Sequence, residues 1–207
     1  GNSFFDLKKD QNGNVFCSGH DLKEITSARE NQDNGHAFFQ RLFDHCSILM
    51  QLIVNSPQPV IAEVDGIATA AGCQLVASCD LAIASTESKF ATPGVNIGLF
   101  FFLLMVALSR NVQKKNAMEM LLTGDFINAE ELPEEIPVAE EDLSEEVNIL
   151  AEKIASKSSM TVSIGKKAFY AQAEMDLSEA YNHTSKIMSD NLLKDDAKEG
   201  IDAEVID

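Results

Sequence analysis

Two apolar segments with a short helix between them constrain this chain more than any other feature. Residues 60–64 (VIAEV) and 80–85 (DLAIAS) are compact and apolar, which is typical of buried strands. The small residues from 68 to 72, and the stretch that runs on to Cys79, predict a short helix between these strands. Buried strands that alternate with helices indicate a layered α/β fold.

The rest of the chain adds one strand near the N-terminus and a series of helices. Residues 14–19 (NVFCSG) predict a strand that ends in a glycine. Apolar residues recur at spacings of three and four through residues 36–55, which predicts a helix that SPQP at 56–59 ends. Further helices are expected at 111–122, 143–157, 161–174 and 177–193, and the acidic tail from Asp195 is expected to be a short helix at best.

Length and charge exclude several classes of partner. The chain has 207 residues, which suits one domain, and its formal net charge is −17. This charge argues against a nucleic-acid partner, because phosphate binding needs a basic face, and against adsorption to an anionic membrane. The longest apolar run, residues 99–108, is well short of the ~20 residues that span a bilayer, so no membrane span is expected. No signal or transit peptide is visible.

The cysteines indicate neither a disulfide framework nor a redox motif. All four lie in apolar stretches, and none pairs as C-x-x-C. We therefore expect buried free thiols in a reducing compartment. No spacing of His, Cys and Asp indicates a metal site. The four are Cys17, Cys46, Cys73 and Cys79.

Small residues lie at two places where a predicted strand turns into a helix, residues 17–21 (CSGHD) and 70–74 (AAGCQ). The first four N–H groups of a helix have no acceptor within the helix, and small side chains let a ligand approach the backbone. Two such N–H groups that converge on one point would form an oxyanion hole for a carbonyl or an enolate. Many α/β proteins have small residues at such turns for packing alone, so the spacing leaves both interpretations open.

The motifs around these turns resemble those of the crotonase superfamily, the enoyl-CoA hydratase/isomerase family. FCSGHDLKE at residues 16–24 is similar to the family block F-x-x-G-x-D-[IL]-K-E. Residues 59–84 resemble the central signature, P-V-I-A-x-[VI]-x-G-x-A-x-G-G-G-x-[ED]-L followed by C-D-x-x-x-A. FATP at 90–93 and MEMLLTG at 118–124 continue the resemblance, which covers residues 14–193.

The resemblance implies an α/β fold of stacked ββα turns that form a superhelix, followed by a helical C-terminal region that trimerises. We therefore expect one domain in two parts, a crotonase core at residues 1–124 and a helical C-terminal region at residues 125–207. The family's N-terminal strands, which precede the first block, are expected to be largely missing from the core. The expected assembly is a homotrimer or a dimer of trimers.

The resemblance also implies roles for individual residues. The backbone N–H groups of His20 and Ala71 would be the oxyanion donors, and the helix that starts at Gly72 would direct its positive dipole end at the thioester oxygen. The adenine of coenzyme A would lie along the backbone of residues 18–22, with Lys23 near the phosphates. The acyl-CoA thioester is the ligand or substrate, and no other cofactor is implied. The residues expected to bind coenzyme A are Ser18, Asp21, Leu22 and Lys23.

The chain departs from the family at the two glutamates that hold and activate water in hydratases. Their positions are occupied by Gln74 and Gly94, which cannot exchange a proton near neutral pH as general acid–base catalysis requires. Phe102 stands where related dienoyl isomerases carry an aspartate. Gln74 either bonds a substrate group or fills the place of the former glutamate, and both interpretations stay open. If the site geometry is intact, returning glutamate to both positions is expected to raise hydration.

Two functions therefore remain open. One is an acyl-CoA-binding protein of fatty-acid metabolism that stabilises a thioester enolate through His20 and Ala71. It would turn over slowly as an isomerase or thioesterase, with a base that the sequence does not identify. The other is a non-catalytic binding or regulatory protein on the same scaffold. For either, the resemblance implies a place in the mitochondrial matrix.

Four further features have ordinary structural explanations beside functional ones. Asp21, with Glu24 three residues later, is expected to be a helix N-cap in a capping box rather than a ribose ligand. The His20 side chain is expected to be tolerated rather than catalytic. The acidic residues 130–146 are expected to be an exposed connection. Residues 99–108 either line an acyl pocket or, as we prefer, pack in the core or at a subunit contact.

Overall fold

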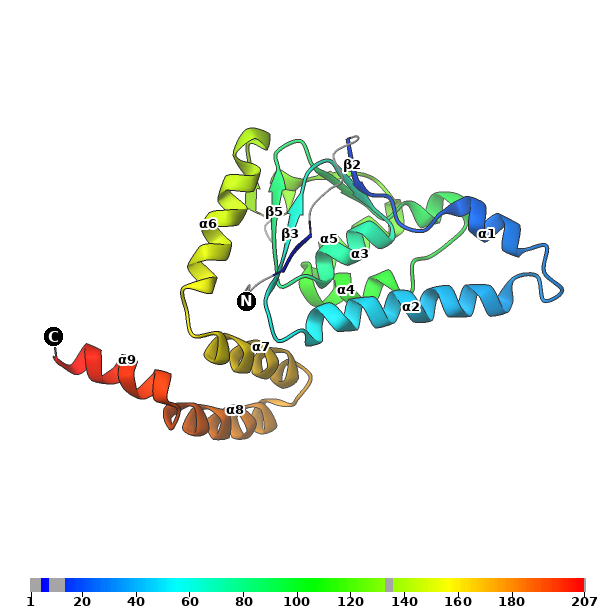
Figure 1. Ribbon diagram of the computed structural model, residues 1–207. Coiled ribbons are helices and arrows are strands. Elements are labelled where there is room, and N and C mark those ends of the chain that lie inside the picture. Colours follow the sequence, from blue (N-terminus) through cyan, green and yellow to red (C-terminus); the bar gives the residue numbers. More distant parts are fainter. Residues whose placement is uncertain (1–4, 8–13, 133–135, 207) are drawn as a thin grey trace.

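The fold is built on two four-stranded sheets (Figure 1). The computed structural model describes residues 5–7, 14–132 and 136–206. In the first sheet all neighbouring strands are parallel, with Ile61 of the second strand opposite Leu81 of the third. In order across the sheet, these strands are β1 (Phe5–Leu7), β3 (Val60–Val64), β5 (Leu81–Ser85) and β8 (Ile136–Val138).

The second sheet takes the strand that follows each of β1, β3 and β5, and its fourth strand comes before β8 in the chain. Its order is β2 (Val15–Cys17), β4 (Ile67–Thr69), β6 (Lys89–Ala91) and β7 (Ile127–Asn128), and only the last pair is antiparallel. The chain thus forms one strand in each sheet before the next helix, as β3, β4 and then α3 (Ala71–Ser78). These stacked ββα turns confirm the expected α/β fold.

Helices on one side of the sheets complete the main core. The long helix α2 (His36–Asn55) turns Cys46, Met50 and Ile53 inward at spacings of four and three, as its periodicity predicts. Short helices surround α3, and they share with it a core that includes the fully buried Phe90. The remaining helices of this part are α1 (Leu22–Ala28), the 3₁₀ helix η1 (Pro93–Ile97), α4 (Leu104–Asn111) and α5 (Lys114–Thr123).

Helix α6 (Leu143–Ala155) covers the first sheet, and the helices after it extend away from the body of the molecule (Figure 1). Leu143, Val147 and Ala151 recur every four residues and form a second core cluster with Ile61 and Ile83. Such spacing puts them on one face of the helix. The extending helices are α7 (Ser159–Ala173), α8 (Leu177–Leu192) and α9 (Asp195–Ile206).

A buried ion pair attaches α7 to the body. The Lys166 Nζ donates hydrogen bonds to the carbonyl oxygens of Ile53 and Gln58 at 2.9 Å each, and to Asp80 Oδ2 at 2.7 Å. The Tyr170 hydroxyl donates to Asp80 Oδ1 at 2.8 Å. Burial, then the hydrogen bond to Asp80, raises the pKa of Tyr170. Because the Lys166 and Asp80 side chains are only 6% and 14% exposed, removing one of them would leave the other charge buried.

The structure differs from the sequence-based expectations at several elements. Strands β4 and β6 were not expected, because three residues are too few for a visible alternation. The helix expected at 111–122 is divided between α4 and α5, with a break at Val112. The tail from Asp195 forms a helix of 12 residues, longer than expected.

The acidic stretch 130–146 is only partly the exposed connection that we expected. Strand β8 lies within it and pairs with β5, while Leu132 and Leu143 are buried. The short 3₁₀ helices η2 (Ala129–Glu131) and η3 (Glu140–Asp142) flank the strand. Strands β7 and β8 therefore complete sheets that begin before residue 124, and helix α6 packs on one of them. The division into residues 1–124 and 125–207 stays a prediction.

Among the described residues, no helix is both long enough and apolar enough to cross a membrane. The cysteines are free thiols, as expected. Three of them are buried and Cys17 is half-buried.

Candidate functional site

The two strand-to-helix turns that the sequence singled out lie in direct contact. A Cβ atom built on Gly19 would lie 2.9 Å from the backbone nitrogen of Ala71. A Cβ atom built on Gly72 would lie 2.1 Å from the carbonyl oxygen of Cys17. Real Cβ contacts are not this short, so the turns can meet only because both positions are glycine. The fold thus brings together two segments that are separated by about fifty residues of sequence.

The backbone at Ala70 is strained. Its φ of 52° and ψ of −125° are unusual for a residue with a Cβ, and its side chain makes no cap for helix α3. Two hydrogen bonds hold this conformation, from the Ala70 N–H to the Ala91 oxygen and from the Gln74 N–H to the Ala70 oxygen, each at 3.1 Å. Such strain costs about 1–3 kcal/mol and often marks a functional turn. Here it turns the Ala71 N–H out at the first residue of the helix.

The two expected oxyanion donors are uncommitted. Within the described part of the chain, neither the His20 N–H nor the Ala71 N–H donates a hydrogen bond to another residue. Both residues are half-buried, so a ligand can reach this backbone. Free N–H groups at a helix start attract a partial negative charge, which a thioester oxygen carries.

The His20 side chain packs against helix α2. Its ring meets the Phe43 ring edge-on, with centroids 5.8 Å apart and planes at 89°. Burial lowers the pKa of His20, which favours the neutral imidazole. A neutral ring held against an aromatic side chain is an ordinary packing arrangement. It leaves the backbone N–H as the part of His20 that the geometry offers to a ligand.

The residues expected to bind coenzyme A follow this turn. Asp21 is the N-cap of α1, and its Oδ1 accepts from the Lys23 N–H at 2.7 Å. The cap is therefore confirmed, although Asp21 bonds the second helical residue and Glu24 does not complete a capping box. Ser18, Leu22 and Lys23 are exposed, with Leu22 at 59%. Their proposed contacts with coenzyme A stay predictions.

Gln74 is buried, and both ends of its amide face the protein. The Cys46 thiol donates to Gln74 Oε1 at 3.6 Å, and Gln74 Nε2 donates to the Leu103 oxygen at a long 3.5 Å. The side chain is 5% exposed, and burial raises the pKa of the Cys46 thiol. This geometry favours the interpretation that Gln74 fills the place of a glutamate over the one in which it binds substrate.

Gly94 has no room for any side chain. A Cβ atom there would lie 2.5 Å from the Leu99 oxygen and 2.9 Å from two carbons of the Phe101 ring. The space beside Gly94, where the resemblance places the second carboxylate, is therefore filled by the chain itself. The sequence showed that Gly94 lacks a carboxylate, but it did not show that the space is filled. The signal was the Phe100 to Phe102 run in place of the family's Gly/Pro-rich loop.

Residues 99–108 divide between the core and the surface. Leu104 and Leu108 are buried in the main core, as we preferred. Phe102, at 69%, and Val106, at 47%, are exposed. A subunit interface at the exposed residues stays a prediction.

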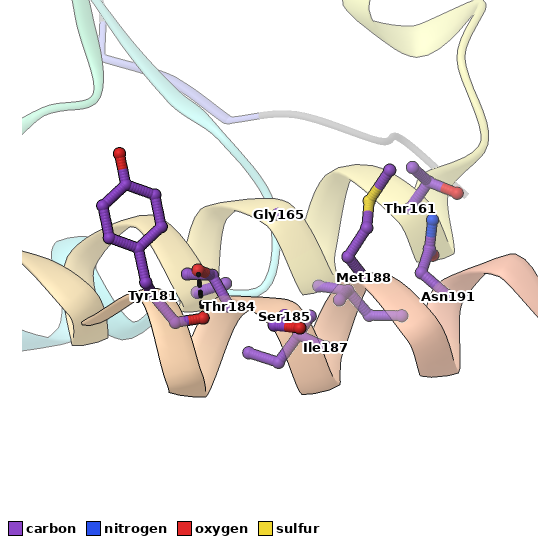
Figure 2. Close-up of a pocket in the computed structure, with 10 residues that line it drawn as sticks. Thr161, Gly165, Tyr181, Thr184, Ser185, Ile187, Met188 and Asn191 are labelled. Carbon is purple, nitrogen blue, oxygen red and sulfur yellow. Dashed lines mark hydrogen bonds between the residues drawn. The ribbon is translucent and has the colours of Figure 1, made fainter. Parts of the chain in front are cut away.

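A surface groove of about 410 Å³ lies away from these turns, between helices α7 and α8 (Figure 2). Gly165 opens the groove on α7, while Tyr181 and Met188 lie along it on α8. The Thr184 hydroxyl is already bonded within its own helix, at 2.8 Å to the Ala180 oxygen. The groove includes no residue of the two turns and has no pair of titratable groups, so it offers no acid–base chemistry.

No metal centre is evident in the described ranges, where no group of three or more His, Cys, Asp or Glu side chains is placed to hold an ion. The chemistry available at the two turns is therefore that of backbone donors and a helix start.

Comparison with known proteins identifies the class to which this fold and site belong. Residues 10–205 match the enoyl-CoA hydratase/isomerase family, and the chain is a member of that family. The human protein called enoyl-CoA hydratase domain-containing protein 3, mitochondrial, is 51% identical over 197 residues. That match covers 92% of this chain and 63% of the human protein. A mitochondrial enoyl-CoA hydratase of Pongo abelii is 34% identical, over 91% of this chain and 64% of the relative. The chain thus spans less than two thirds of these relatives' length.

Solved structures confirm the fold. The crystal structure of human enoyl-CoA hydratase domain-containing protein 3 superposes with a TM-score of 0.88 at 48% identity, over 98% of this chain and 79% of that one. An enoyl-CoA hydratase of Mycobacterium smegmatis superposes with a TM-score of 0.86 at 43% identity, over 93% and 75% of the two chains. The expected crotonase fold with C-terminal helices is therefore correct.

Proposed function

We propose that this chain binds an acyl-CoA thioester at the junction of the two turns and holds the thioester oxygen with the N–H groups of His20 and Ala71. The observation that carries the proposal is the contact between the turns, where Gly19 and Gly72 remove every side chain that would separate them. The uncommitted donors and the strained Ala70 support it. Helix α3 adds its positive dipole end at the same place.

Such a pair of donors stabilises an enolate. One well-placed donor stabilises the negative charge that develops on the thioester oxygen by about 2.7–4 kcal/mol. The arrangement therefore acidifies the α-carbon of the bound acyl group. Hydration needs more than this, because water must be held and deprotonated by a titratable group. Gln74 and Gly94 offer none, so the site supports enolate stabilisation without hydration.

A second function, non-catalytic binding of the acyl-CoA, is favoured by a specific observation. The Gln74 amide is engaged by Cys46 and Leu103, and Gly94 is covered by Leu99 and Phe101. The His20 ring packs edge-on against Phe43, so the imidazole is already engaged in a packing contact. Under this alternative the protein sequesters or senses an acyl-CoA of fatty-acid metabolism.

The biological setting is proposed from the relatives. Their names include the word mitochondrial, which supports a role in the mitochondrial matrix. A homotrimer or dimer of trimers would place the exposed apolar residues of α8, such as Tyr181 and Leu192, against another subunit. Analytical ultracentrifugation tests the assembly, since a monomer at micromolar concentration contradicts it.

Isothermal titration calorimetry with acetyl-CoA tests the binding. We expect heat of binding in the native chain and none in Gly19→Val, whose side chain collides with Ala71 at a φ of 88°. Gly165→Ala is the matched control, because a Cβ there meets no atom within 4 Å and alanine favours a helix. Absence of heat for the native chain at millimolar acetyl-CoA and free coenzyme A contradicts both functions.

Exchange of α-protons separates the two functions. In deuterated water, enolate formation exchanges α-protons of bound acetyl-CoA for deuterium, whereas simple binding does not. Incorporation above that of the Gly19→Val variant supports turnover. Binding with neither hydration nor exchange leaves the non-catalytic function.

A further inference from the structure

Residues 99–103 cover both of the positions at which the resemblance places a carboxylate, Gln74 and Gly94. Leu99 and Phe101 cover Gly94, and the Leu103 oxygen accepts from the Gln74 amide. We call the residues in these contacts the acyl wall: Gln74, Gly94, Leu99, Phe101 and Leu103.

The acyl wall lies where a bound acyl group would extend. Gln74 is three residues after Ala71 on helix α3, and residues three apart lie on the same face of a helix. The Ala71 and Gln74 side chains therefore share one face of α3, and Gln74 stands where the resemblance places a glutamate that acts at the acyl group. The acyl carbons beyond the carbonyl have to pass the side chain of Gln74 and whatever covers it.

The covering segment is held in place at both ends. The Leu99 N–H donates to the Gly94 oxygen at 2.9 Å, which closes the turn of η1. The Phe102 N–H donates to the Phe100 oxygen at 2.9 Å, a γ-turn centred on Phe101. The Met105 N–H then donates to the Phe101 oxygen at 3.0 Å and leads into helix α4.

Side chains anchor the same segment. Leu104, the first residue of α4, is 3% exposed, and Phe100, Phe101 and Leu103 pack against the main core. The Phe100 and Phe102 rings also meet, with centroids 5.3 Å apart. Backbone bonds and core packing together make this segment a fixed wall, because moving it would break several contacts at once.

We infer that the acyl wall restricts the site to thioesters with a very short acyl group, of acetyl size, and that Phe101 is the residue that sets this limit. The inference rests on the proposed function, since it assumes that the thioester binds at His20 and Ala71. A longer chain meets protein atoms that cannot yield, whereas acetyl ends before the wall. Discrimination of this kind comes from steric exclusion and is about tenfold or more.

The test compares the affinities of free coenzyme A, acetyl-CoA, butyryl-CoA and octanoyl-CoA by calorimetry. The native chain is expected to bind acetyl-CoA at least about tenfold more tightly than octanoyl-CoA. In Phe101→Ala the two affinities are expected to come within about threefold of each other. Phe101→Leu, which keeps an apolar contact with the core, is expected to shift in the same direction if Phe101→Ala does not fold.

Phe102→Ala is the matched control. It removes a neighbouring ring of the same size that is 69% exposed and does not limit the space at Gly94. The control is expected to keep the native preference for acetyl-CoA. Equal affinity of the native chain for octanoyl-CoA and acetyl-CoA overturns the inference, and so does unchanged discrimination in folded Phe101→Ala and Phe101→Leu.

The proposed function fails by a different result. If neither free coenzyme A nor any of the three thioesters binds, then the binding site itself is wrong, and the inference falls with it. If all thioesters bind equally, the binding site stands and only the role of the acyl wall is overturned.

Discussion

The two turns and the acyl wall meet along helix α3. The turns keep their backbone N–H groups free, whereas the polar groups of the acyl wall are covered by protein. The turns present the His20 and Ala71 N–H groups, which bond to no other described residue. In the acyl wall, Gln74 bonds to protein on both ends of its amide, and Gly94 faces backbone and ring atoms. The difference shows that backbone donors can stay available where side-chain chemistry has no space.

The physical reason lies in what each region needs. An oxyanion hole needs backbone N–H groups and small residues, which the ββα fold supplies wherever the turns meet. A carboxylate pair needs two titratable side chains and a cavity for water between them. Loss of the carboxylate pair leaves the oxyanion hole intact, so the acyl wall can close without disturbing the two turns.

The largest effect is expected at the contact between the turns. Gly72→Ala places a Cβ atom 2.1 Å from the Cys17 carbonyl oxygen. This oxygen and its carbon belong to the backbone and cannot rotate away as a side chain could. We expect the free energy of unfolding to fall by about 3 kcal/mol or more, with loss of acetyl-CoA binding. Urea denaturation measures the first and calorimetry the second. A variant with native stability and affinity would show that the turns are not in contact.

Gly94→Ala breaks the acyl wall by a smaller amount. Its Cβ atom meets the Leu99 oxygen at 2.5 Å and the Phe101 ring at 2.9 Å, a smaller overlap than the one at Gly72. Overpacking of this kind costs about 1–3 kcal/mol of unfolding free energy. Chemical denaturation checks this, with Gly165→Ala as the control that meets no neighbour.

The same crowding decides what the glutamate double variant does. If the geometry were open, Gln74→Glu with Gly94→Glu would raise hydration, as the sequence alone leads one to expect. Because the space at Gly94 is filled, we expect the double variant to hydrate crotonyl-CoA no faster than the native chain does. The ultraviolet absorbance of crotonyl-CoA measures this hydration. Clear hydratase activity would show that residues 99–103 move aside and that the wall is not fixed.

Gln74→Glu alone sharpens the comparison through pH. An ionised glutamate side chain at this position cannot donate to the Leu103 oxygen as the Gln74 amide does. Because the carboxylate is also buried, its pKa in the folded state is raised above the value in the unfolded state. The folded state then binds more protons than the unfolded state, and stability falls as pH rises through this range. We expect a loss of about 1–2 kcal/mol at neutral pH that shrinks near pH 4. Gln74→Met, which cannot ionise, should show no such pH dependence.

The smallest effect is expected at the His20 side chain, because the site uses its backbone. His20→Ala loses the ring contact with Phe43 and should lower the unfolding free energy by about 1 kcal/mol. Affinity for acetyl-CoA should change by less than about threefold, since the N–H remains. Abolished binding in a folded His20→Ala would assign the imidazole itself to the ligand.

His20 also predicts a pH dependence that the variant removes. Burial lowers the folded-state pKa of His20 below the ordinary 6.5, so the unfolded state binds more protons between the two values. The contribution of the neutral ring to stability is therefore present above pH 6.5 and is lost as pH falls through the folded-state pKa. Denaturation curves should therefore show the full stability difference between the native chain and His20→Ala above pH 6.5, and a smaller difference on the acid side.

The sequence by itself determined the fold class, the two long strands of the first sheet and most of the helices. Strands β3 and β5 and helix α2 carry strong apolar patterns, and the pattern reports burial directly. It also located both turns, because small residues at strand ends and the family motifs around them are local features. The replacement of the two glutamates by Gln74 and Gly94 was likewise visible from the residues alone.

Only the tertiary structure decided what those replacements mean. Strands β4 and β6 are three residues long and exist because neighbouring strands pair with them, which no local pattern reveals. The contact of Gly19 with Ala71, and the closure of Gly94 by Leu99 and Phe101, join residues that the sequence separates. Steric exclusion depends on atoms brought together by the fold, so the open turns and the closed acyl wall could be told apart only once the chain was folded.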